Sequence, residues 1–131
     1  MGSGHTTQAS RLHTALPDGA FEIIDEVEDL LVYVAASAPP DLTEPARQAL
    51  TSGGKRLRPL LLVLSARMGE STRKDLLGAA TAIEVLHTAT LIHDDIVDRA
   101  ESRRGAPTTV AGHGREIAAA TGDYLFAEAF S

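Results

Sequence analysis

Apolar side chains recur every three or four positions along most of this chain, which is the spacing of a helix that buries one face. The sequence shows neither strand alternation nor an internal repeat. The first amphipathic stretch covers residues 18–37, and Pro39-Pro40 ends it because proline cannot continue a helix. Its apolar stripe consists of Phe21, Ile24, Val27, Leu31 and Val34. The pattern therefore predicts an all-α protein.

The same spacing places four more helices after the two prolines. Thr43 is predicted to be an N-cap with Pro45 inside the first turn, and the glycine pair at 53–54 is predicted to stop that helix. Ser71 or Thr72 is predicted to cap the longest helix. The predicted helices are 18–37, 43–52, 56–68, 72–98 and 113–130, the last loosened at Gly122, with a loop at 99–111.

Composition restricts the kind of protein. Of the 131 residues, 44% are hydrophobic but only 4% are aromatic, which suits helices packed through alanine, leucine and valine. The absence of cysteine excludes disulfides and thiolate–zinc sites, and is consistent with a cytoplasmic location. A net charge of −6 argues against a nucleic-acid partner, and no apolar run approaches the roughly 20 residues of a membrane span. We predict a disordered polar start at 1–17 and part of one helical domain at 18–131.

Three carboxylates, Asp94, Asp95 and Asp98, stand within five residues of an otherwise apolar helical stretch. On a helix, Asp94 and Asp98 share one face, whereas Asp95 is rotated by about 100° from Asp94. Like charges one turn apart repel, so a cation is expected between them. Mg²⁺ commonly bridges one or two carboxylates to substrate phosphates, which makes it the natural candidate. The alternative is a solvated acidic helix end.

Two short basic segments stand out in this acidic chain. Residues 53–59 read GGKRLRP and residues 102–108 read SRRGAPT, and together they hold five of the twelve lysines and arginines. Glycine lets the backbone approach an oxyanion, and arginine can bind phosphate through two N–H groups. The first segment is not a Walker A loop, because Ala49 replaces the leading glycine and Arg56 replaces the Ser or Thr after the lysine. The acids and the basic segments together indicate a site for one or two diphosphates.

Four ordered motifs give the chain a resemblance to a known family. GGKRLRP, EVLHTATLIHDDIVD, SRRGAPT and GDYLFAEAF follow one another as in the trans-prenyl diphosphate synthases (polyprenyl synthetases), from about residue 20 to Ser131. The resemblance implies an antiparallel helical bundle of the isoprenoid synthase type around a central cavity. It also implies chain elongation with Mg²⁺ as cofactor, in which an allylic prenyl diphosphate ionises and isopentenyl diphosphate attacks the cation.

The resemblance assigns the candidate residues to the two diphosphates. The Mg²⁺ ligands for the allylic diphosphate are Asp94, Asp95 and Asp98, and Arg103 contacts the same substrate. These four are also the predicted catalytic residues. The residues for isopentenyl diphosphate are Lys55, Arg58, His87 and Arg104. Without the motifs, His87 would be interpreted as a histidine of the helical core, and Arg103 and Arg104 as part of a solvated turn.

The helix that carries the acids also leads to an expectation about product length. Ala89 and Thr90 lie four to five residues before Asp94, one turn deeper along the helix. In family members that stop early, a bulky aromatic side chain at these positions forms a floor, whereas small side chains leave the path open. Leu86 and Ile83 lie further down and would contact a longer tail. The resemblance therefore implies a product longer than farnesyl diphosphate.

One departure from the family pattern concerns length. The family has a second aspartate-rich motif far downstream, and this sequence stops at Ser131 before any such motif. We therefore expect the N-terminal part of a synthase, which is inactive alone, needs the rest of the domain from its own chain or another, and forms a homodimer when complete. A non-catalytic subunit or prenyl-diphosphate-binding protein is the alternative. A class I terpene cyclase is disfavoured, because it has no second diphosphate for GGKRLRP to bind.

Overall fold

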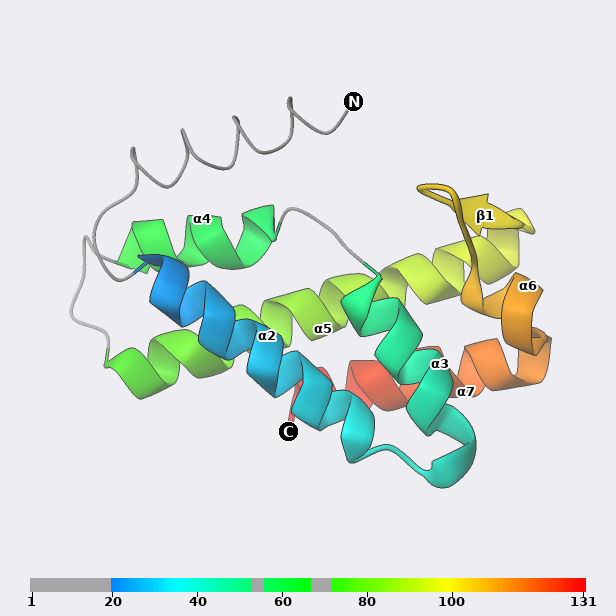
Figure 1. Ribbon diagram of the computed structural model, residues 1–131, viewed down its shortest axis with the longest axis horizontal. Helices are drawn as coiled ribbons and strands as arrows, with labels where there is room; N and C mark the ends of the chain where they lie inside the picture. The colour runs from blue at the N-terminus through cyan, green and yellow to red at the C-terminus, as the bar shows by residue number, and fades with distance from the viewer. Residues whose placement is uncertain (1–19, 53–55, 67–71) are drawn as a thin grey trace.

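The computed structural model describes residues 20–52, 56–66 and 72–131. Figure 1 shows these residues as a bundle of helices with a small hairpin at one end. The predicted disorder at 1–17 and the glycine stop at 53–54 lie outside the described residues. The elements are α2 (Ala20–Ala36), α3 (Pro40–Thr51), α4 (Leu57–Ala66), α5 (Arg73–Asp98), β1 (Ser102–Arg103), β2 (Ala106–Pro107), α6 (Thr109–His113) and α7 (Arg115–Ala129). The all-α prediction is confirmed.

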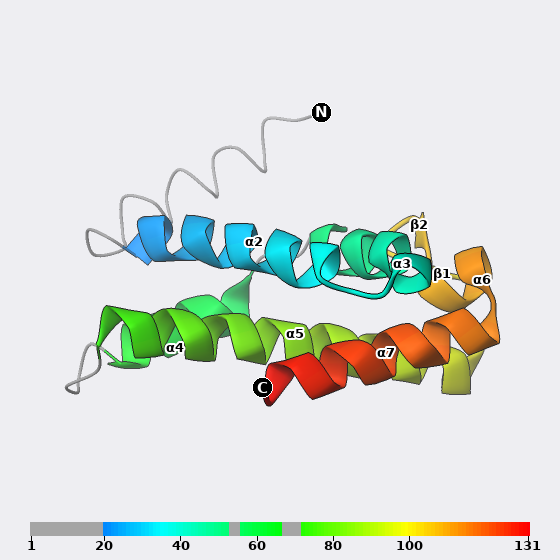
Figure 2. The same ribbon diagram turned by 90° about the horizontal axis from the view of Figure 1, so that it is seen from below.

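The helices form two layers. Figure 2 shows α2 and α3 in one layer and α4, α5 and α7 in the other. The 26-residue helix α5 is central, and it packs most extensively against α7 and then α4. By length and hydropathy alone α5 could cross a membrane, but a core helix of a bundle has the same composition. Its packing on several other helices favours the second interpretation.

The core lies between the two layers and is built from aliphatic side chains. On α2 the buried row is Ile23, Val27, Leu31 and Ala35, at a spacing of four residues. The predicted stripe was therefore right at its centre, while Ile24 and Val34 at its sides are only partly buried. The partners of this row in the core include Leu50, Val63, Val85, Ala89 and Leu125. Burial of the valine, leucine and isoleucine side chains, at about 1.5–3 kcal/mol each, is the main force that holds the layers together.

The predicted start of the second helix was wrong. Helix α3 begins at Pro40, with Pro39 as the residue before it, and Pro45 lies inside the helix. The Thr43 hydroxyl donates to the backbone oxygens of Ala38 and Pro39, at 3.2 and 3.1 Å, instead of capping a helix. The reason is that proline fits the first turn, where its missing N–H is not needed. The two prolines therefore stop one helix and start the next.

The predicted cap of the longest helix was right. The Thr72 hydroxyl accepts a hydrogen bond from the backbone N–H of Asp75 at 3.1 Å. At the other end, Arg99 adopts a left-handed conformation with φ 54°, and its N–H bonds to the carbonyls of Asp95 and Ile96. Helix α5 therefore stops directly after Asp98.

The region predicted as a loop at 99–111 is more ordered than expected. Strands β1 and β2 pair antiparallel, and the two-residue turn between them, Arg104-Gly105, has φ values of 53° and 79°. Such a turn suits the twist of a hairpin, and strands this short leave no alternation in the sequence. Thr108 then caps α6, and Gly114, with φ 88°, separates α6 from α7. The last helix thus starts at 115 instead of 113 and runs through Gly122 without a break.

Candidate functional site

The three aspartates divide between two faces of α5. Asp94 and Asp98 expose their side chains and form no ion pair within the residues that the structure describes. Asp95 is buried, and it accepts two hydrogen bonds from Arg103, at 2.7 Å from Nη2 and 3.3 Å from Nε. Because Arg103 lies on β1, the hairpin after α5 is what brings this arginine back to the acids. Asp94 and Asp95 thus point to different sides of α5, as expected from their rotation around the helix axis, and only Asp95 is buried.

Arg103 sits in a strongly negative field. Its hydrogen bond to Asp95 raises the pKa of the guanidinium, and the charges of Asp95, Asp94 and Asp98 act in the same direction, against the effect of burial. One cation therefore faces three carboxylates, two of which lack a protein partner among the described residues. The arrangement has spare negative charge on its exposed side.

The donor set suits a hard cation that is shared with a ligand. Across residues 20–52, 56–66 and 72–131, no three His, Asp or Glu side chains gather closely enough to hold an ion by themselves. Asp94 and Asp98 provide two carboxylates one turn apart on an exposed face. Mg²⁺ is commonly held by one or two carboxylates, with substrate phosphates and water completing its shell. These two residues are therefore the ones that fit Mg²⁺.

A basic site lies further back along the same helix. Arg58, in the first turn of α4, places Nη1 3.1 Å from Nε2 of His87 on α5. Burial lowers the pKa of His87, and the charges of Arg58, Arg104 and Arg103 lower it further, while Glu84 opposes them. A guanidinium can only donate, so neutral His87 accepts through Nε2. Lys55, the other predicted member, lies outside the described residues.

The two sites share one face of α5. His87 and Asp94 are seven residues apart, which is about 10 Å along a helix. Arg103 and Arg104 on the hairpin are close enough for their charges to act on His87. The structure thus brings together Arg58, His87, Arg103 and Arg104 near an exposed pair of acids, which is an arrangement that could hold two anionic groups side by side.

The predicted product-length residues differ in exposure. Ala89 is completely buried in the core, whereas Thr90 is exposed and its hydroxyl donates to the backbone oxygen of His87 at 2.7 Å. Leu86 and Ile83 are partly buried. Among the four, Thr90 is therefore the one whose enlargement would leave the described core undisturbed.

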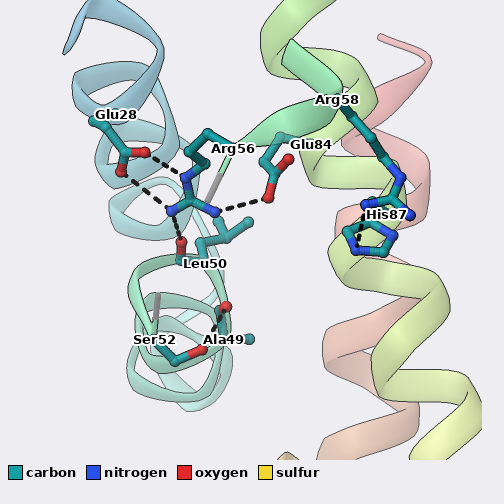
Figure 3. Close-up of polar contacts among 8 residues, drawn as sticks. All are labelled: Glu28, Ala49, Leu50, Ser52, Arg56, Arg58, Glu84 and His87. Atoms are coloured by element: carbon teal, nitrogen blue, oxygen red, sulfur yellow. Dashed lines mark hydrogen bonds and ion pairs between the residues drawn. The ribbon is translucent and has the colours of Figure 1, made fainter. Parts of the chain in front are cut away.

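Sequence reasoning missed Arg56, which the structure places at the centre of a polar network. Figure 3 shows its guanidinium between Glu28 of α2, Glu84 of α5 and the backbone oxygen of Leu50 at the end of α3. Nη1 lies 2.7 Å from Glu84, and Nη2 lies 2.6 Å from the Leu50 oxygen and 3.1 Å from Glu28, to which Nε also donates. Burial would lower the pKa of Arg56, but Glu28 and Glu84 outweigh it and raise the pKa. No local pattern in the sequence signals this network, because Glu28 and Glu84 are each 28 residues from Arg56.

A second missed contact joins α5 to α7. Nε2 of His93 lies 3.1 Å from an oxygen of Asp123, and the His93 ring lies directly over Gly122. A Cβ at Gly122 would stand 2.4 Å from Nε2 of His93. Any larger residue at 122 would therefore displace the His93 ring, and the GD pair of the GDYLFAEAF motif was the available signal.

Comparisons with known proteins show which family the chain resembles. A family model described as Polyprenyl synthetase matches residues 39–131. A geranylgeranyl diphosphate synthase of Sulfolobus acidocaldarius is 44% identical over 109 residues, which are 83% of this chain and 33% of the relative. The structure of a heptaprenyl diphosphate synthase from Staphylococcus aureus has a TM-score of 0.80 at 33% identity, and the match covers 86% of this chain and 36% of that one.

A further solved structure is also similar. It is a polyprenyl synthase from Caulobacter crescentus complexed with calcium and isoprenyl diphosphate, with a TM-score of 0.79 at 36% identity. The match covers 85% of this chain and 34% of that one. The chain therefore spans about a third of the length of the relatives it matches. By the family model and by these likenesses, the chain belongs to the polyprenyl synthetase family.

Proposed function

We propose that the protein containing this chain joins isopentenyl diphosphate to an allylic prenyl diphosphate. The observation that carries the proposal is the sharing of one face of α5 by an exposed acid pair and a cationic Arg58–His87 pair two turns earlier. The acid pair suits a metal-bound diphosphate, and the cationic pair suits a diphosphate bound directly. Membership of the family supports this assignment.

The chain's own residues have distinct roles in this proposal. Asp94 and Asp98 would hold Mg²⁺, which when bound would neutralise the charge of the departing diphosphate. Asp95 accepts from Arg103 and so orients that guanidinium beside the acids. Arg58 and neutral His87, with the predicted Lys55 and Arg104, would bind the second diphosphate. The calcium and isoprenyl diphosphate in the Caulobacter crescentus structure support the pairing of cation and diphosphate.

Calorimetry tests the metal-dependent part. Geranyl diphosphate is titrated into the protein with and without Mg²⁺, and Asp94→Ala/Asp98→Ala is expected to abolish the Mg²⁺-dependent binding. The matched control is Asp25→Ala/Asp29→Ala, because these aspartates are also exposed and one turn apart, but on α2. Equal binding by both double variants would refute the assignment.

We also propose a product longer than farnesyl diphosphate. Thr90 presents a small, exposed side chain one turn before Asp94, so a tail anchored at the acids could pass it. Thr90→Phe should shorten the product, because an aromatic side chain would fill this path. Chromatography compares the chain lengths of the products made by the wild type and by Thr90→Phe. If a Thr90→Phe protein of normal stability makes the same products, the argument from Thr90 is wrong. Ala89→Phe is the less useful variant, since Ala89 is fully buried.

Residues 1–131 as an isolated polypeptide are proposed not to elongate prenyl chains. A developing cation needs charges placed in advance, and the family's second aspartate-rich motif lies outside these residues. Large apolar side chains are also exposed among the described residues, including Tyr33, Val97 and Phe130 at 69%, 80% and 71%. An elongation assay on this polypeptide tests the proposal, and turnover without any added chain would contradict it. Homodimerisation and a cytoplasmic location stay predictions.

A further inference from the structure

We infer that Arg56 is a positioning residue that holds Arg58 against His87, and so builds the proposed isopentenyl diphosphate site without touching the ligand. The inference rests on the proposed function for the identity of the ligand. Its structural basis is the polar network of Figure 3, in which one guanidinium contacts three helices.

Four hydrogen bonds to protein groups already engage Nε, Nη1 and Nη2 of Arg56. Nε and Nη2 donate to Glu28, Nη1 donates to Glu84, and Nη2 also donates to the Leu50 oxygen. Only 10% of the Arg56 side chain is exposed, and the Glu84 side chain is exposed by 7%. A diphosphate would have to displace two carboxylates of its own sign to reach this guanidinium. Arg56 is therefore placed to act through its neighbours.

The backbone links Arg56 to the start of α4. Its φ of 52° lies in the left-handed region, which is uncommon for a residue with a Cβ and needs support from its surroundings. Its carbonyl accepts from the backbone N–H of Leu60 at 3.1 Å, which is the first turn of α4. Arg58 stands two residues later in that turn. Fixing the side chain of Arg56 thus fixes the point from which Arg58 extends.

The two arginines contact α5 one turn apart. Arg56 pairs with Glu84 at 2.7 Å, and Arg58 contacts His87 at 3.1 Å. Residues three apart on a helix lie on the same side, so α4 is attached to α5 at two successive positions. The first contact is buried and involves opposite charges, whereas the second is exposed and joins a cation to a neutral ring. The first contact is the stronger one and sets the geometry of the second.

Nuclear magnetic resonance of the His87 ring tests the contact directly. In Arg56→Lys the guanidinium fork is lost while the charge stays, so Arg58 should move and the His87 Nε2 resonance should shift toward its position in Arg58→Ala. Glu28→Gln, which weakens one side of the network only, should produce a smaller shift in the same direction. The matched control is Arg73→Lys, since Arg73 also joins α5 to α2, through Glu26, but at an exposed pair. It should leave the His87 resonance unchanged.

The steady-state kinetics of chain elongation by the complete protein give a second readout. Arg56→Lys should raise the KM for isopentenyl diphosphate by about tenfold, the size expected for a displaced charge-assisted hydrogen bond. The KM for the allylic diphosphate should change far less. Arg73→Lys should alter neither constant.

The outcomes separate the inference from the proposed function. If His87 keeps its resonance in Arg56→Lys and the KM for isopentenyl diphosphate is unchanged, Arg56 is only structural and the inference is wrong. If Arg56→Lys raises the KM for isopentenyl diphosphate and the KM for the allylic diphosphate equally, the variant has only lost stability, and the inference is wrong. If Arg58→Ala leaves the KM for isopentenyl diphosphate unchanged, the proposed ligand is wrong, and the resonance experiment still decides whether Arg56 positions Arg58.

Discussion

Arg56 and Arg103 both pair with carboxylates of other elements, yet their surroundings differ. The Arg56 side chain is 10% exposed and joins three helices, whereas the Arg103 side chain is 44% exposed and reaches Asp95 from a hairpin. Arg56 donates hydrogen bonds to the carboxylates of Glu28 and Glu84 and to a backbone oxygen. Arg103 pairs with one acid while two more stay exposed nearby.

This difference in exposure and in the number of paired carboxylates distinguishes a structural ion pair from one that can bind a ligand. A buried network must satisfy its own charges, because unpaired charge away from water is costly. An exposed cluster can keep an excess of one sign, and it then favours a counter-charge from outside. By this criterion the Arg56 network is structural, whereas the exposed acids near Arg103 suit the cation of the proposed function.

The largest effect is expected from breaking the buried network. Arg56→Met should destabilise the protein by about 3–5 kcal/mol, because it leaves the buried carboxylate of Glu84 without its partner. Arg73→Met, which removes an exposed pair between α5 and α2, should cost only about 0–1 kcal/mol. Urea denaturation measures both free energies of unfolding. Equal losses would mean that burial does not distinguish the two pairs.

Packing behind the acids should give the next largest effect. Gly122→Ala should cost about 1–3 kcal/mol, because the new methyl would overlap the His93 ring and displace it from its contact with Asp123. Gly78→Ala, at an exposed position of α5 with open space around it, should instead stabilise by up to about 1 kcal/mol. Thermal unfolding compares the two. Effects of the same sign would show that the His93 ring moves aside at little cost.

The acids themselves should respond in opposite directions. Asp95→Asn should destabilise by roughly 1–2 kcal/mol, because it removes a charge-assisted pair with Arg103. Asp98→Asn should stabilise by roughly 0.2–0.5 kcal/mol in the absence of Mg²⁺, because it relieves repulsion by Asp94 one turn away. Urea unfolding at low salt is the measurement. A loss of stability in Asp98→Asn would mean that this acid has a structural partner after all.

The smallest effect concerns His87 and pH. Burial and the charge of Arg58 lower the pKa of His87 below its ordinary 6.5, so the unfolded chain takes up this proton before the folded one. His87 should therefore reduce stability as the pH falls below about 6.5, with the full loss reached below the folded pKa. Arg58→Ala should weaken this dependence. The measurement is the free energy of unfolding as the pH falls from above 6.5, together with a titration of the His87 ring followed by NMR. A titration midpoint of the folded His87 ring above 6.5 would contradict the prediction.

Periodicity in the sequence predicted most of the helices and the division of the aspartates, because both follow from the turn of an α-helix. It could not predict the start of α3, since two adjacent prolines can both end and begin a helix. The hairpin was missed because two-residue strands leave no pattern. Nor could it link Arg56 to Glu28 and Glu84, each 28 residues away, because long-range pairing depends on how helices pack.

The placement of both proposed sites on one uninterrupted helix restricts how related sequences can diverge. Each residue inserted between His87 and Asp94 would turn one site by about 100° around the helix relative to the other. Seven intervening steps bring the two almost back into line, with a drift of about 20°. Single insertions and deletions between them should therefore be eliminated by selection, whereas substitutions that preserve the buried side chains keep the two sites in line. The spacing of seven should be more constant than the residues that fill it.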